Sequence, residues 1–114
     1  MQRDAAYLVD VLAACRRVQQ YVLGCAWEDF LADQMRQDAV IRQMEIMGEA
    51  ANRLSPEARS RIGGVPWQDM IGMRNVLIHG YDAVDLAIVW DTAARRVPGL
   101  IEALERHVEP GDPG

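Results

Sequence analysis

The sequence contains no lysine, so all 12 of its basic residues are arginine, and 17 acidic residues outnumber them. With a formal net charge of −5, the chain is not expected to hold a polyanion such as nucleic acid through its overall electrostatic field. Contact with nucleic acid would therefore need a local cluster of arginine. The same acidic balance would also suit a partner protein with a basic face.

Cysteine is scarce as well. Cys15 and Cys25 are isolated thiols without the spacing of a metal site, and they fit a reducing compartment better than a disulfide framework. The chain has neither the apolar core of a signal peptide nor an apolar run approaching the ~18 residues that span a membrane. We therefore expect a cytoplasmic protein that does not associate with membranes.

Alternating runs of β-branched residues, which are typical of strands, are also missing, and helical periodicity takes their place. Long helices are predicted at residues 3–23, 34–54, 66–80 and 84–108, with short helical turns at 27–32 and 56–62. Pro98 is expected to kink or break the last long helix. We predict an all-α fold, an up-and-down four-helix bundle with additional short helices. Residues 1–109 should form one domain, and residues 110–114 a frayed tail.

Residues 74–81, Arg-Asn-Val-Leu-Ile-His-Gly-Tyr, carry most of the reactive side chains. The planar guanidinium of Arg74 fits a phosphate, His79 can accept and donate a proton near neutral pH, and the Tyr81 hydroxyl is a candidate for modification. On a helix, Asn75 and His79 lie about 40° apart, whereas Arg74 and His79 lie about 140° apart. One straight helix therefore cannot direct Arg74 and His79 at the same phosphate, which favours a symmetric dimer with a composite site.

The helix that carries this motif is expected to end at Gly80, which places His79 in the last turn, where the helix dipole favours the protonated imidazolium. Its apolar residues, among them Ile78, predict burial on more than one side. A simpler interpretation of the same residues is that His79 is only a helix cap and Arg74 only an ion-pair partner.

The helix at 34–54 has a heptad seam, formed by Val40, Met44, Met47, Ala51 and Leu54. Gly48 lies in the next row and costs about 1 kcal/mol relative to Ala in a helix interior, which close approach of another backbone would explain. Arg42, Glu45 and Glu49 share one flank. They form either an ion-paired surface or a set that orients Arg74 or His79. The two carboxylates lack a histidine in register, so we expect no metal centre and no cofactor.

Three stretches of the chain resemble the HepT-like ribonuclease toxins of the HEPN superfamily. They are residues 42–50 (Arg-Gln-Met-Glu-Ile-Met-Gly-Glu-Ala), 65–67 (Val-Pro-Trp) and 71–81, which ends in the Arg-x4-His-x-Tyr motif. The segments 89–91 and 97–100 are also similar to that family. The resemblance covers nearly the whole chain, and the Arg-x4-His-x-Tyr motif is its most specific part.

The resemblance implies a homodimer in which the motif helices meet at a cleft and cleave RNA, either tRNA or mRNA, without a metal ion. Arg74 and His79 would be catalytic, with Asn75 assisting. The resemblance also implies a type VII toxin–antitoxin pair, in which an MntA-type nucleotidyltransferase antitoxin transfers AMP to Tyr81. The alternatives are a non-catalytic helical dimer that binds a nucleotidyltransferase as an assembly module, a structural adaptor with an accidental motif, and a metal-dependent carboxylate enzyme.

Overall fold

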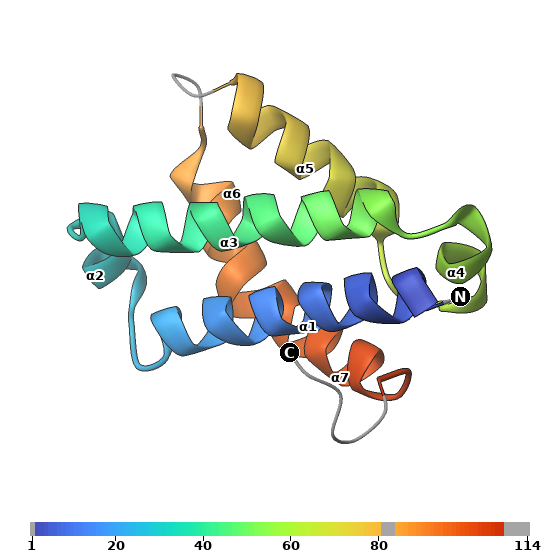
Figure 1. Cartoon of the computed structure of the whole chain (residues 1–114). Coiled ribbons are helices and arrows are strands. Elements are labelled where there is room, and N and C mark those ends of the chain that lie inside the picture. Colours follow the sequence, from blue (N-terminus) through green and yellow to red (C-terminus); the bar gives the residue numbers. More distant parts are fainter. Residues whose placement is uncertain (1, 81–83, 109–114) are drawn as a thin grey trace.

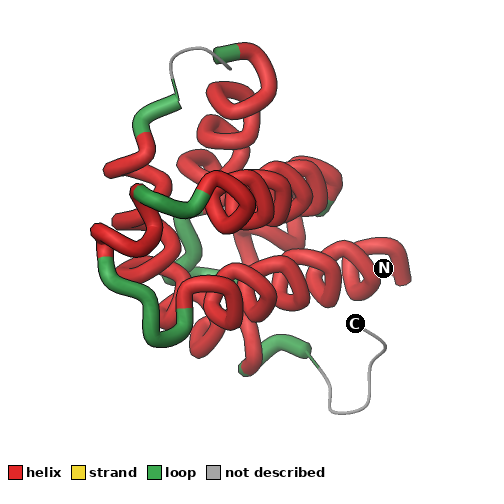
Figure 2. Tube along the Cα trace, turned by 90° about the vertical axis from the view of Figure 1, so that its left-hand side faces the viewer, coloured by secondary structure: helices red, strands yellow, loops and turns green. Residues whose placement is uncertain are grey.

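The computed structural model describes residues 2–80 and 84–108, and every regular element within them is helical, as predicted (Figures 1 and 2). The helices are α1 (Gln2–Val22), α2 (Trp27–Leu31), α3 (Gln34–Arg53), α4 (Pro56–Arg61), α5 (Trp67–His79), α6 (Leu86–Asp91), the π-helical η2 (Thr92–Arg96) and α7 (Val97–Glu105). Within this described part, no helix is both long and apolar enough to cross a membrane. The predicted tail at 110–114 lies outside the described residues.

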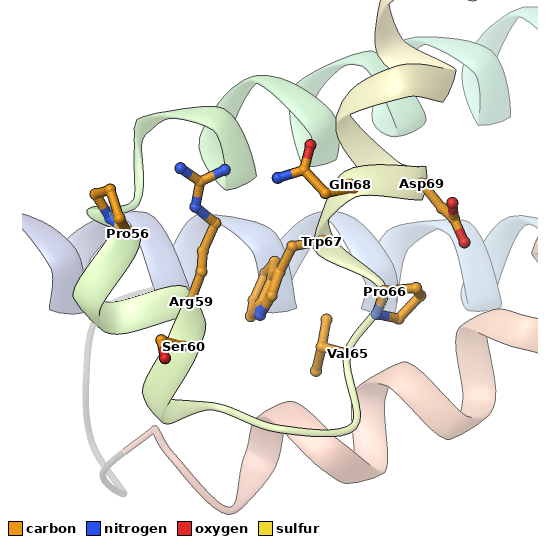
Figure 3. Close-up of a pocket in the computed structure, with 8 residues that line it drawn as sticks. All are labelled: Pro56, Arg59, Ser60, Val65, Pro66, Trp67, Gln68 and Asp69. Atoms are coloured by element: carbon orange, nitrogen blue, oxygen red, sulfur yellow. The ribbon is translucent and has the colours of Figure 1, made fainter.

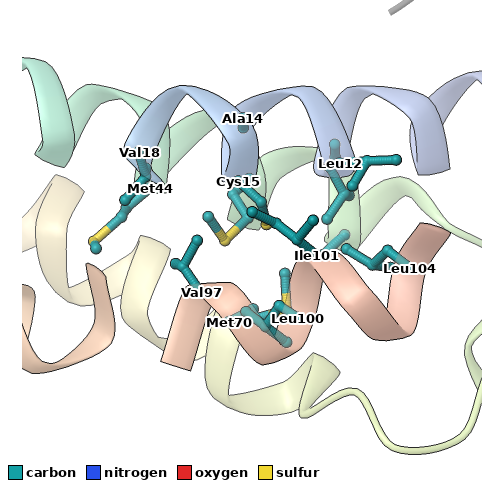
Figure 4. Close-up of a cluster of buried hydrophobic side chains, with 14 of the residues drawn as sticks. Leu12, Ala14, Cys15, Val18, Met44, Met70, Val97, Leu100, Ile101 and Leu104 are labelled. Carbon is teal, nitrogen blue, oxygen red and sulfur yellow. The ribbon is translucent and has the colours of Figure 1, made fainter. Parts of the chain in front are cut away.

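The antiparallel pair of α1 and α3 is the centre of the fold, and the heptad seam of α3 is buried, as expected. Figure 4 shows a part of this core. The side chains drawn there include Cys15 and Val18 of α1, Met44 of α3, Met70 of α5 and Leu104 of α7. Burying each large apolar side chain contributes roughly 1.5–3 kcal/mol.

Polar side chains set the ends of several helices. Asp33 caps α3 by accepting a hydrogen bond from the Arg36 N–H at 3.1 Å. Ser55 caps α4 in the same way through the Ala58 N–H. Asp4, at the start of α1, accepts hydrogen bonds from the Ser55 N–H at 2.9 Å and the Ser55 hydroxyl at 2.7 Å. This contact ties the beginning of the chain to the α3–α4 junction.

Pro98 does not break the last helix, because the chain accommodates it by widening the preceding turn. In a regular α-helix, Pro98 would lack its hydrogen bond and would clash with the carbonyl four residues back. Instead, residues 92–96 form a π-helix in which the N–H of Val97 donates to the carbonyl of Thr92. Helix α6, this π turn and α7 therefore follow one another without a gap.

Helix α5 packs mainly on α3, which lies between α5 and α1 in Figure 1. Its buried side chains are Trp67, Met70 and Leu77. The prediction that α5 is buried on more than one side is wrong for the single chain. Ile78 is 41% exposed, and Val76, on the same helix, is 57% exposed. Two apolar side chains of the helix that carries the motif, which lie about 160° apart around its axis, are therefore open to solvent.

Candidate functional site

The motif residues described in the structure lie on the second half of α5, which ends at Gly80 as predicted. The N–H of Gly80 donates to the carbonyl of Val76 at 2.7 Å, and a Cβ at position 80 would lie 2.8 Å from that same oxygen. A side chain at this position would therefore strain the end of the helix. The stop at Gly80 leaves His79 in the last turn, with its side chain exposed.

Arg74 points towards α3, and contacts within the chain hold its guanidinium. Its Nη2 lies 2.6 Å from Glu49 Oε2, and its Nη1 donates to Asn75 Oδ1 at 3.0 Å. The side chain is 26% exposed, and its Nε is buried without a hydrogen-bond partner. Such a half-buried cation beside a carboxylate is oriented far more tightly than a surface arginine.

Glu49 also contacts a second arginine. Its Oε1 accepts a hydrogen bond from Nε of Arg53 at 3.0 Å, and Nη2 of the same arginine forms an ion pair with that oxygen, also at 3.0 Å. The pKa of Arg53 is raised above its ordinary value, first by Glu49 and then by the Tyr7 hydroxyl. The sequence prediction did not include Arg53, although its i, i+4 spacing from Glu49 is the spacing of a helical ion pair.

The flank of α3 that was expected to support the motif is thus divided. Glu49 reaches Arg74, whereas Arg42 and Glu45 pair with each other, with Nη1 of Arg42 and Oε1 of Glu45 3.7 Å apart. In the described part of the chain, no three His, Cys, Asp or Glu side chains lie together as a metal site would require. Of the three residues on this flank, only Glu49 contacts a motif residue, Arg74.

His79 is not joined to Arg74. Among the described residues, its side chain makes no hydrogen bond or ion pair, and Asn75, which shares its side of the helix, is also exposed. Tyr81 lies outside the described residues. The structure therefore brings Arg74, Asn75 and Glu49 together and leaves His79 facing away from the chain. This agrees with the angle of about 140° that an ideal helix places between Arg74 and His79.

Neither of two cavities in the structure is lined by Arg74 or His79. One, of about 490 Å³, lies between α4 and the start of α5, where Arg59 and Gln68 flank Trp67 (Figure 3). The other, of about 830 Å³, has four methionines in its wall, and Asp91, Thr92 and Arg96 of the α6–η2 segment also line it. The motif thus lies on an open face of α5 that a single chain leaves unenclosed.

A family model and a relative with an assigned name indicate the same family. A family model described as "Ribonuclease HepT-like" matches residues 11–107. A protein of Thermococcus cleftensis, named a probable ribonuclease HepT, is 35% identical over 100 residues, which cover 88% of this chain and 91% of the relative. No solved structure gives a significant match.

Two further relatives are provisionally named as RNases. The relative from Caldanaerobacter subterraneus subsp. tengcongensis is 37% identical over 100 residues, covering 88% of this chain and 89% of its own length. One relative from Methanocaldococcus jannaschii is 33% identical over 105 residues, covering 91% of this chain and 96% of its own length.

Proposed function

Because the chain belongs to the HepT-like ribonuclease family, we propose that it is a metal-independent endoribonuclease that acts through Arg74 and His79, and that it is the toxin of a toxin–antitoxin pair. The observation that carries this proposal is the arrangement of α5. A half-buried, ion-paired arginine and an exposed histidine lie on one helix, together with two apolar side chains, Val76 and Ile78, that the single chain leaves open.

The chemistry requires no metal ion, because RNA carries its own nucleophile. The ribose 2′-oxygen attacks the adjacent phosphorus, and the bond from phosphorus to the 5′-oxygen breaks, which leaves a 2′,3′-cyclic phosphate and a 5′-hydroxyl. The His79 imidazole accepts the 2′-hydroxyl proton, and water gives a proton to the leaving 5′-oxygen. The Arg74 guanidinium stabilises the negative charge that gathers on the phosphoryl oxygens.

A second copy of the chain supplies the Arg74 guanidinium that acts with the first chain's His79, and it covers the exposed side of α5. Val76 is 57% exposed and lies about 60° from His79 around an ideal helix, so a two-fold contact through this side of α5 would bury apolar surface and bring the two motifs together. Asn75, exposed on the same helix and bonded to Arg74, is positioned to assist in holding the substrate.

Cleavage of a mixed RNA substrate in the presence of excess chelator tests the enzymatic proposal. The wild-type protein should cut the RNA to products with 2′,3′-cyclic phosphate ends. His79→Ala should lose at least about 100-fold in rate, the usual scale for removing a general acid–base group. An unchanged rate in His79→Ala would exclude the assigned role. A wild-type protein that binds a nucleotidyltransferase but cuts no RNA would instead be the assembly module.

The proposed antitoxin is an MntA-type nucleotidyltransferase that transfers AMP from ATP to the Tyr81 hydroxyl, with release of pyrophosphate. The added phosphodiester is negatively charged and the adenine is bulky, so both would oppose the binding of RNA beside the motif. Mass spectrometry after incubation with ATP and the nucleotidyltransferase should find AMP on Tyr81 and none on a Tyr81→Phe protein. Modification of another residue, with Tyr81 unmodified, would reject this assignment.

A further inference from the structure

We propose that Glu49 is a positioning residue that holds the Arg74 guanidinium for contact with the scissile phosphate, and that Arg53 holds Glu49 in turn. The inference rests on the proposed ribonuclease function, which it deepens. It concerns a chain of three side chains, Arg53, Glu49 and Arg74, in which each of the two carboxylate oxygens of Glu49 serves a different arginine.

The two arginines differ in exposure and in their distance from the Glu49 carboxylate. Arg53, 57% exposed at the surface of α3, donates one hydrogen bond from Nε to Glu49 Oε1 at 3.0 Å and forms an ion pair with the same oxygen through Nη2. Arg74, only 26% exposed, approaches Glu49 Oε2 to 2.6 Å. A carboxylate fixed at one oxygen has little freedom left at the other, so Arg53 restricts where Oε2 can lie. The carboxylate therefore offers Arg74 a fixed acceptor.

The donors of Arg74 show which part of the guanidinium remains for a substrate. A guanidinium has five N–H groups in a fixed plane. One on Nη2 faces Glu49, one on Nη1 is donated to Asn75, and the one on Nε is buried. The two that remain are on the terminal nitrogens, so a phosphate must approach that end of the plane. Glu49 and Asn75 together set the direction of that approach.

The aliphatic part of the Arg74 side chain contacts α3, the same helix that binds its guanidinium. The Cβ of Arg74 lies against Gly48, the residue next to Glu49, where any side chain on α3 would overlap it. Contacts at two successive residues of α3 thus fix both ends of one arginine. An arginine needed only as a surface cation would not require this degree of restraint.

Removing the negative charge of Glu49 distinguishes the positioning role from a simpler role, because the two predict opposite changes in activity. If Glu49 only competed with RNA phosphate for Arg74, removing its charge would strengthen RNA binding and raise activity. If Glu49 positions Arg74, its removal should lower kcat, because a catalytic group displaced by about 1 Å can lose on the order of 100-fold. The KM for RNA should then change little or fall, since the cation is kept.

The first experiment measures kcat and KM for RNA cleavage by wild type, Glu49→Gln, Arg53→Gln and the double variant. Glu49→Gln should lower kcat at least about tenfold with KM within about threefold of wild type. Arg53→Gln should lower kcat less, and should have no further effect when Glu49 is already Gln, because it acts through Glu49. Glu45→Gln is the matched control, one turn earlier on the same flank, and should retain wild-type kcat because Glu45 pairs with Arg42.

The second experiment is independent of cleavage. In nitrogen-15 NMR spectra of the folded protein, the Arg74 guanidinium, assigned with Arg74→Lys, should show hindered rotation in wild type and in Glu45→Gln. It should show averaged signals in Glu49→Gln. Identical Arg74 signals in wild type and Glu49→Gln would overturn the inference whether or not the protein cuts RNA, and so would a rise in kcat in Glu49→Gln. If Glu49→Gln released the rotation of the Arg74 guanidinium but the wild-type protein did not cut RNA, the role of Glu49 in holding Arg74 would be supported and the proposed function would be refuted.

Discussion

Gly48 of α3 and Arg74 of α5 lie so close that a side chain at position 48 could not fit between them. A Cβ there would overlap the Cβ of Arg74 and would lie 2.8 Å from the Met70 carbonyl oxygen. The Met70 oxygen is a backbone atom and the Arg74 Cβ is attached directly to the backbone, so neither can move unless α5 moves. The glycine thus allows the helix that carries the motif to approach α3 closely enough for the Arg74–Glu49 ion pair.

Replacing Gly48 with Ala should therefore push α5 away from α3. We expect a loss of about 1–3 kcal/mol in the free energy of unfolding, the usual cost of overpacking, although Ala is the better helix former. RNA cleavage should fall in parallel, because Arg74 moves with α5. Chemical denaturation and the cleavage assay measure the two effects.

Gly99→Ala is the matched control for this substitution, because a Cβ at Gly99 in α7 meets nothing within 4 Å. It should leave cleavage unchanged and stabilise the protein by up to about 1 kcal/mol. If Gly48→Ala were as stable as wild type, the close approach of α5 and α3 would not be the reason for the glycine.

The composite site predicts that two inactive proteins restore activity when they are mixed. In an Arg74→Ala/His79→Ala heterodimer, one site receives its arginine from one subunit and its histidine from the other, and both are intact. After refolding an equimolar mixture, about half of the dimers are mixed and one of their two sites works, so about a quarter of wild-type activity should return. A mixture as inactive as its two components would place Arg74 and His79 of each working site on the same chain.

The Asp4–Ser55 contact predicts a defined pH dependence of stability. The two hydrogen bonds from Ser55, with smaller contributions from the N-terminal amine and Arg61, lower the pKa of Asp4, against an opposing effect of burial. A carboxyl whose pKa is lower in the folded state contributes stability above its unfolded pKa of about 3.9 and loses it as the pH falls below that value.

Asp4→Asn should consequently melt below wild type at pH 7, and the difference should shrink as the pH is lowered towards 3. Thermal melts across that range measure this. Asp10→Asn, an exposed position on the same helix, should show no such trend. A difference between Asp4→Asn and wild type that stayed constant down to pH 3 would contradict a role for the Asp4 charge.

The two thiols should differ sharply in reactivity. Burial raises the pKa of Cys15 to about 12, whereas Cys25 is only half-buried, with Nη1 of Arg36 2.8 Å from its Sγ. Because the thiolate is the nucleophile, iodoacetamide at pH 8 should add one label to the native chain and two to the denatured chain. Intact mass and peptide mapping identify the sites. Rapid labelling of Cys15 in the folded protein would show that its environment is open.

The sequence predicted those features of the fold that depend on local pattern. The heptad seam of α3, the stop at Gly80 and the close approach at Gly48 follow from periodicity and glycine chemistry, and all three are confirmed. The π turn before Pro98 was missed, because proline predicts a disturbance without specifying how the backbone absorbs it.

The candidate site was less predictable, because its contacts join different helices. Arg42, Glu45 and Glu49 share one flank of α3, and only the packing of α5 shows that Glu49 faces Arg74 and the other two do not. The exposure of Ile78 was also unexpected. Its apolar character predicted burial, and a sequence does not specify whether the burying surface belongs to the same chain or to another.

The limited packing of α5 affects its local stability. The helix rests mainly on α3, so separating these two surfaces would release it while α1, α3 and α7 remained packed together. Its backbone amides should therefore exchange with solvent through a partial opening that costs less free energy than global unfolding. A partner that covers the exposed side of α5, where Val76 lies, would close this opening by mass action, so dilution of the protein would weaken the ordering of the helix that carries Arg74 and His79.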